Sequence, residues 1–148
     1  MSLPNFDAFR THMLNVPREI GRTLNEYGAW RPVLTLDCRG SLYVVAVAGL
    51  LTNREGWLAV AAGKLPELLV EREARFYALV TPACWVMNGD TPAEETLIVH
   101  LARAGHSETW VATIERGNGK VTLGQWQQRE TVDSLGLGPL DAAVGAVV

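Results

Sequence analysis

Residues 96–123 read "TLIVHLARAGHSETWVATIERGNGKVTL", and this stretch decides the fold. The segments 96–103 and 108–115 are rich in β-branched and aromatic residues, and Ala104-Gly105-His106 separates them as a predicted turn. The segment "GNGK" at 117–120 contains an Asn-Gly pair, which tolerates the positive φ angles of a type I′ hairpin turn. The stretch therefore predicts three consecutive antiparallel strands.

The flanking sequence extends this pattern to a four-stranded β-meander. The segment "ARFYALVTPACWVM" at 74–87 predicts a preceding strand that ends at the Asn88-Gly89 turn. The segment "TPAEE" at 91–95 has the pattern of a single capped turn. The segment "VTLGQWQQRE" at 121–130 supplies the last strand.

The first half of the chain predicts a β-hairpin at 33–50. Residues 33–37 and 41–50 are rich in strand-forming residues, and Cys38-Arg39-Gly40 separates them. The second of these segments is almost entirely apolar. A continuous apolar run favours a central strand buried on both faces.

Two helical regions complete the prediction, at 1–28 and at 53–73. In the first, Pro17 predicts a kink or a restart, and Gly28 a C-terminal cap. In the second, we expect a helix bent or restarted at Pro66, although "WLAVA" at 57–61 also suits a short strand. The first helix has apolar residues at steps of three or four, namely Phe6, Phe9, Met13, Val16, Ile20, Leu24 and Tyr27.

Together these elements predict an α+β fold with a mostly antiparallel sheet and helices packed on one face. The order is an N-terminal helix, a β-hairpin, a helix and then the β-meander. A length of 148 residues suits one domain, 1–148. The apolar C-terminal tail, 133–148, is expected to dock on this domain or on a second copy.

The composition argues against several classes of function. Hydrophobic residues make up 48% and charged residues 20% of the chain, which is typical of a folded protein and not of a disordered one. The net charge is −3, and Arg18, Arg22 and Arg31 are interleaved with Glu19 and Glu26. We therefore expect no nucleic-acid partner, since such proteins usually concentrate positive charge on one face.

The sequence also predicts a soluble, cytoplasmic protein. The two cysteines, Cys38 and Cys84, give no disulfide framework, and the N-terminus shows no secretory signal. The longest apolar stretch, Leu42 to Leu51, has 10 residues, whereas a membrane-spanning helix needs about 20. We therefore expect no membrane partner.

No motif for a metal or a nucleotide is present in the sequence. His12, His100 and His106 form no HExxH or His-x-His pattern, so we expect no metal site and no cofactor. His106 is expected to be solvated. The glycines of "GNGKVTLG" lack the GxxxxGK[ST] spacing, and neither GxGxxG nor GxSxG occurs.

One pair of residues could carry chemistry. Cys84 and His100 are predicted on neighbouring strands, and Asp37 or a glutamate could orient the imidazole. Such a set would lower the pKa of the thiol and generate a nucleophile. The competing interpretation is that Cys84 packs as a small buried hydrophobe.

Five tryptophans, Trp30, Trp57, Trp85, Trp110 and Trp126, form either a core or an aromatic platform. Pairing across "GNGK" would place Trp110 roughly level with Trp126. Our leading hypothesis is a small non-catalytic protein that acts through self-association, as a homodimer, or through binding of another protein. The alternatives are a cysteine-dependent hydrolase or transferase using Cys84 and His100, and a binder of small apolar molecules.

Overall fold

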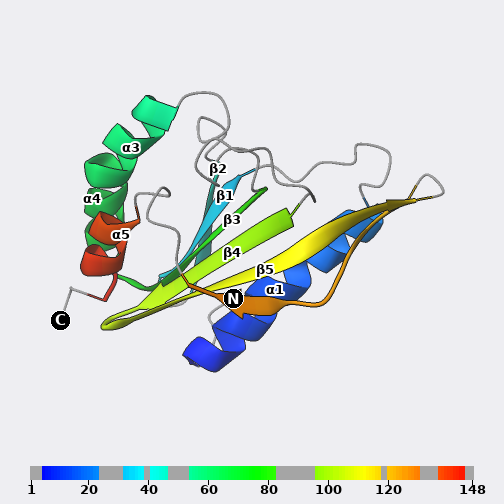
Figure 1. The fold of residues 1–148 in the computed structure, drawn as a ribbon. Coiled ribbons are helices and arrows are strands. Elements are labelled where there is room, and N and C mark those ends of the chain that lie inside the picture. The colour runs from blue at the N-terminus through cyan, green and yellow to red at the C-terminus, as the bar shows by residue number, and fades with distance from the viewer. Residues whose placement is uncertain are drawn as a thin grey trace.

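The protein has an α+β fold built on an antiparallel sheet, as the sequence predicts (Figure 1). The computed structural model describes residues 5–23, 32–38, 41–46, 54–82, 96–117, 120–130 and 137–145. Its helices are α1 (Phe6–Thr23), α3 (Arg54–Ala62), α4 (Lys64–Glu71) and α5 (Gly138–Ala143). Its strands are β1 (Val33–Cys38), β2 (Ser41–Ala46), β3 (Ala74–Pro82), β4 (Thr96–Arg103), β5 (His106–Gly117), β6 (Lys120–Leu123) and β7 (Gln127–Arg129).

The strands form one sheet in the order β2-β1-β3-β4-β5-β6, and β7 pairs with β5 beside β6. The predicted meander is confirmed, because β3, β4, β5 and β6 are neighbours in chain order and all their pairings are antiparallel. Gly117 pairs with Lys120, which confirms the hairpin at "GNGK". The predicted hairpin in the first half is also confirmed, since Cys38 pairs with Ser41.

Two apolar cores lie on opposite faces of the sheet. Neighbouring residues of β4 belong to different cores, because successive side chains of a strand point to opposite faces. The core on the α1 face is formed by Phe6, Phe9, Met13, Phe76, Ala78, Val80, Leu97, Val99, Leu101, Ala112, Ile114 and Leu123. The core on the α5 face includes Leu34, Leu36, Trp57, Leu65, Leu69, Tyr77, Leu79, Ile98, Leu137, Leu140 and Val144.

The helices therefore cover both faces, and the expectation that they pack on one face is corrected (Figure 1). Helix α1 covers one face, while α3, α4 and α5 cover the other. The physical reason is that β3 and β4 are buried on both sides. Seven of the nine residues of β3, namely 74 and 76–81, are buried, and so are six of the eight residues of β4. A sheet with two apolar faces has to bury both of them.

Strand β2 lies at the edge of the sheet, so its prediction as a central strand is wrong. Among the described strands β2 pairs only with β1, whereas β1 also pairs with β3. Val44 is 62% exposed and Tyr43 is 36% exposed. The apolar run did identify a strand, but a strand lacking a neighbour on one side can have the same composition as a buried one.

Both predicted helical regions are confirmed, but the positions at which they break differ from the prediction. Helix α1 continues through Pro17 as one element up to Thr23. The break in the second region falls at Gly63, three residues before Pro66, and "WLAVA" is helical. The C-terminal tail docks on the same chain through α5. Predictions for Gly28, for the Asn88-Gly89 turn and for 91–95 lie outside the described residues.

None of the described helices combines the length and the apolar character needed to cross a membrane.

Candidate functional site

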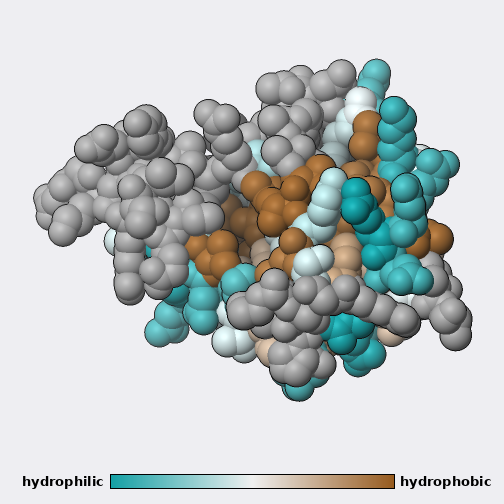
Figure 2. All heavy atoms as spheres, turned by 180° about the vertical axis from the view of Figure 1, so that it is seen from behind, coloured by the Kyte–Doolittle hydropathy of each residue, from teal (hydrophilic) through white to brown (hydrophobic). Residues whose placement is uncertain are grey.

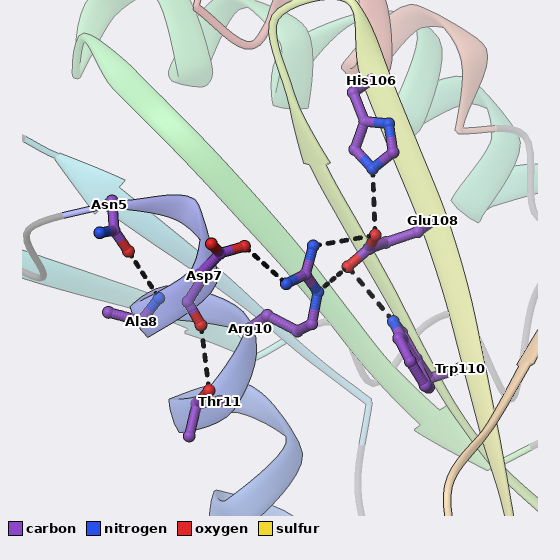
Figure 3. Close-up of polar contacts among 8 residues, drawn as sticks. All are labelled: Asn5, Asp7, Ala8, Arg10, Thr11, His106, Glu108 and Trp110. Atoms are coloured by element: carbon purple, nitrogen blue, oxygen red, sulfur yellow. Dashed lines mark hydrogen bonds and ion pairs between the residues drawn. The ribbon is translucent and has the colours of Figure 1, made fainter.

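A buried carboxylate, Glu108, lies at the centre of a polar cluster between α1 and β5 (Figure 3). Its side chain is 4% exposed. Arg10 of α1 donates to both carboxylate oxygens, through Nε to Oε1 and through Nη2 to Oε2, the latter at 3.1 Å. His106 Nε2 lies 3.0 Å from Oε2, and the indole N–H of Trp110 donates to Oε1 at 3.2 Å. Arg10 also donates to Asp7 at 2.7 Å.

The electrostatics of this cluster argue for a structural role. Burial by itself would raise the pKa of Glu108, but the hydrogen bonds from Arg10, His106 and Trp110 outweigh it and hold this pKa below its ordinary value. The hydrogen bond to Glu108 likewise raises the pKa of Arg10. A carboxylate that stays ionised and already accepts four donors is a poor general base, and the adjacent guanidinium disfavours a metal cation. The hydrogen bonds from Arg10 to Glu108 hold α1 against the sheet.

A second buried cluster lies on the opposite face, beneath α5. His100 Nε2 lies 3.0 Å from Oδ1 of Asp141, and His100 Nδ1 lies 3.0 Å from Oγ1 of Thr109. The hydroxyl of Tyr77 donates to the same Asp141 oxygen. Burial, together with the negative charge of Asp141, raises the pKa of Tyr77, so its hydroxyl stays protonated and acts as a donor.

The order Asp141–His100–Thr109 has the connectivity of a carboxylate, an imidazole and a hydroxyl nucleophile. Its burial argues against that chemistry, because the Thr109 and His100 side chains are almost completely covered. Asp141, by contrast, is 28% exposed and is the one member that solvent reaches directly. The cluster ties the C-terminal helix to the sheet, since Asp141 is the acceptor for two buried sheet side chains.

The structure places His100 but not its proposed partner. Cys84 lies outside the described residues, so its pairing with His100 is not tested. The imidazole points away from Leu97, Val99 and Leu101, as the strand alternation predicts, and it faces α5. The proposal that Asp37 orients it is wrong, because the Asp37 carboxylate instead accepts from Arg75 at 3.0 Å.

Sequence reasoning missed Asp141 as the partner of His100. The signal was present in the tail, where Leu137, Leu140 and Val144 have helical spacing and Asp141 lies between them. His106, which we expect in a turn and solvated, has a side chain that is 38% exposed. It is the first residue of β5, and it is held by Glu108.

No set of three histidine, cysteine, aspartate or glutamate side chains in the described parts of the chain is arranged to hold a metal ion. Cys38 is buried, and burial together with the charge of Asp37 raises its pKa. It is therefore a weak nucleophile.

The described tryptophans divide between the two faces. Trp57 belongs to the core on the α5 face, whereas Trp110 and Trp126 pack against the core on the α1 face. Trp110 pairs with Gln128, two residues beyond Trp126, so the two indoles are only approximately level. The indole N–H of Trp126 donates to the carbonyl of Leu14 at 3.0 Å. These side chains contribute to packing on both faces and do not form one aromatic platform. Trp30 and Trp85 lie outside the described residues.

The two edges of the sheet differ in chemistry. Strand β2 reads "SLYVVA" and carries no charged residue. At the other end of the sheet, β7 consists of Gln127, Gln128 and Arg129, which are all exposed, and β6 begins with Lys120. In the space-filling view, hydrophobic side chains gather in the middle of the rear face, in the region of β1 and β2 (Figure 2). Within β2, Leu42 and Val45 pack against the two cores and Arg72 lies over the ring of Tyr43, whereas Val44 is 62% exposed, more than any other large hydrophobic residue of the described surface.

Comparison with known proteins gives no family: no protein-family model matches this chain, and neither curated proteins nor solved structures show significant similarity to it.

Proposed function

We propose that this protein is a non-catalytic association module that binds a polypeptide strand along the outer edge of β2. The observation that carries the proposal is the chemistry of this edge, where Val44 is 62% exposed in a strand without a single charge. An edge strand offers a row of backbone N–H and C=O groups to another chain. Strand addition of this kind is a common mode of peptide recognition.

The contrast with the opposite edge supports this choice. Soluble proteins protect sheet edges from pairing with charged side chains, above all lysine. The exposed Arg129 supplies such a charge at the β7 edge, whereas Ser41–Ala46 contains no charged residue. The two polar clusters favour the same interpretation, because both hold helices against the sheet and Glu108, His100 and Thr109 are buried.

The experiment measures strand binding with a defined probe. A fluorescent peptide of residues 40–47, with two added lysines for solubility, is titrated with the protein, and binding is followed by anisotropy. We expect Val44→Lys to weaken binding at least about tenfold, because it places a charge at the centre of the pairing. The matched control, Gln128→Lys, changes the opposite edge and should bind as the unmodified protein does. Equal binding by all three proteins, or no binding by any, would overturn the proposal.

The alternative is a cysteine-dependent hydrolase or transferase that uses Cys84 and His100. One observation favours it, namely the 3.0 Å contact between His100 and Asp141, because a catalytic imidazole needs a carboxylate to orient it. Its test is the alkylation rate of Cys84 by iodoacetamide at pH 7 in the unmodified protein and in His100→Gln. A rate that is slow, or that His100→Gln leaves unchanged, would eliminate this function.

A further inference from the structure

We infer that the strand bound at this edge is β2 of a second copy, paired antiparallel about a two-fold axis beside Val44. This inference rests on the proposed function and names its partner. Its starting point is self-complementarity, because none of the six residues of β2 is charged, so the strand brings no like charges of its own together when it pairs with itself. Closed two-fold dimers are also the commonest assemblies of soluble proteins.

The β1–β2 register determines which backbone groups of β2 point outward. Cys38 pairs with Ser41 across a two-residue connection, in which the flanking pair is hydrogen-bonded. Because hydrogen-bonded and non-hydrogen-bonded pairs alternate along an antiparallel ladder, every second residue from Ser41 onward bonds to β1. The remaining residues direct their N–H and C=O groups away from the sheet. These residues are Leu42, Val44 and Ala46.

A two-fold axis perpendicular to the sheet keeps both faces continuous only when paired residues point to the same face. Centring the pairing on Val44 meets this condition and uses the outward groups, since Val44 then pairs with its own copy and Leu42 with Ala46 of the second chain. On the other face Tyr43 lies opposite Val45 of the second chain. Every pair is apolar or aromatic, a favourable combination across strands.

This geometry also explains why association would stop at two chains. The pairing uses the β2 edge of both copies, and the remaining edges are the polar ones at β6 and β7. An unsymmetrical contact would leave one apolar edge open and permit further growth. The structure therefore points to a closed dimer with one sheet continuous across the axis.

The experiment is disulfide trapping in a Cys84→Ser background, in which Cys38 stays buried. Hydrogen-bonded residues opposite one another have Cα atoms roughly 5.5 Å apart, within the range that a disulfide spans. Val44→Cys should therefore oxidise to a covalent dimer for most of the protein on a non-reducing gel. Tyr43→Cys and Gln128→Cys are the controls, and both should stay monomeric at the same protein concentration.

Sedimentation velocity at micromolar concentration separates the possible failures. A dimer that forms in the unmodified protein and dissociates in Val44→Lys, together with trapping only through Val44→Cys, supports the inference. If Tyr43→Cys is trapped in place of Val44→Cys, the register is wrong and the proposed function stands. If the unmodified chain is monomeric yet binds the peptide of residues 40–47, the second copy is wrong as the partner. If neither the dimer nor peptide binding depends on Val44, the proposed function itself fails.

Discussion

Replacing Glu108 by glutamine tests the hydrogen bonds that hold α1 against the sheet. The glutamine has nearly the same shape, but it offers one acceptor oxygen where the carboxylate offers two, and it carries no charge. Arg10 loses a charge-assisted pairing at a site that is 4% exposed, and an amide N–H2 group then faces one of the donors, His106 or Trp110. We expect the free energy of unfolding to fall by about 2–4 kcal/mol.

The expected loss stays below that of an isolated buried charge, because Arg10 keeps its contact with Asp7. Asp7→Asn is the matched control: it removes the other carboxylate that Arg10 contacts, but Asp7 is 83% exposed. An exposed pair of this kind contributes roughly 0.2–1 kcal/mol. The difference in the free energy of unfolding between Glu108→Gln and Asp7→Asn measures how much burial strengthens the pairing of Arg10 with a carboxylate.

The assay is urea unfolding followed by tryptophan fluorescence at several pH values. The pKa of Glu108 is lowered in the folded protein, so the stability that it contributes is fully present above the ordinary carboxyl pKa of the unfolded chain. It is lost as the pH falls through the lowered pKa of the folded state. The difference in the free energy of unfolding between the unmodified protein and Glu108→Gln should therefore become smaller in acid. A difference that is absent at pH 7, or that is the same in acid as at pH 7, would refute the reasoning.

Three further predictions concern the α5 face. Gly145→Ala should destabilise the protein by more than about 1 kcal/mol in urea unfolding. Gly145 has φ +69°, and a Cβ there would lie 2.8 Å from Cβ of Ala104. An unchanged free energy of unfolding would contradict this steric argument. Asp141→Asn should cost about 1–2 kcal/mol and speed amide hydrogen exchange in α5, because Tyr77 and the imidazole beneath the helix share one Asp141 oxygen; unchanged exchange would contradict the role of Asp141 in docking. Cys38 should react with iodoacetamide more slowly than an unfolded peptide at pH 8, and denaturant should remove the difference, since burial raises its pKa; alkylation as fast as in the peptide would contradict its burial.

The sequence predicted the features that local patterns determine. Strands β4 and β5 follow from β-rich segments, and the hairpin between Gly117 and Lys120 follows from an Asn-Gly turn. The α+β class could be predicted because these signals are independent of distant contacts. The position of β2 could not be predicted, because an apolar run indicates a strand but does not indicate which element covers it.

The sequence could not predict the two polar clusters, and the reason is different. Arg10 and Glu108 are 98 positions apart, and His100 and Asp141 are 41 apart, so no local spacing relates them. The placement of α1 on the face opposite α5 is equally non-local. It depends on both faces of β3 and β4 being apolar, a pattern that a single alternating strand would not show. Residue types could suggest candidates, but the sheet order decided the partners.

Amide hydrogen exchange along β2 tests the central claim most directly. The amide protons of Leu42, Val44 and Ala46 point away from β1, so they exchange fast in a monomer and become protected when a second β2 pairs with them. We predict that their protection, measured by NMR, rises with protein concentration, while the amides of Gln127 and Arg129 at the opposite edge do not change. Exchange at Leu42, Val44 and Ala46 that is independent of concentration across the range in which the protein associates would contradict the account.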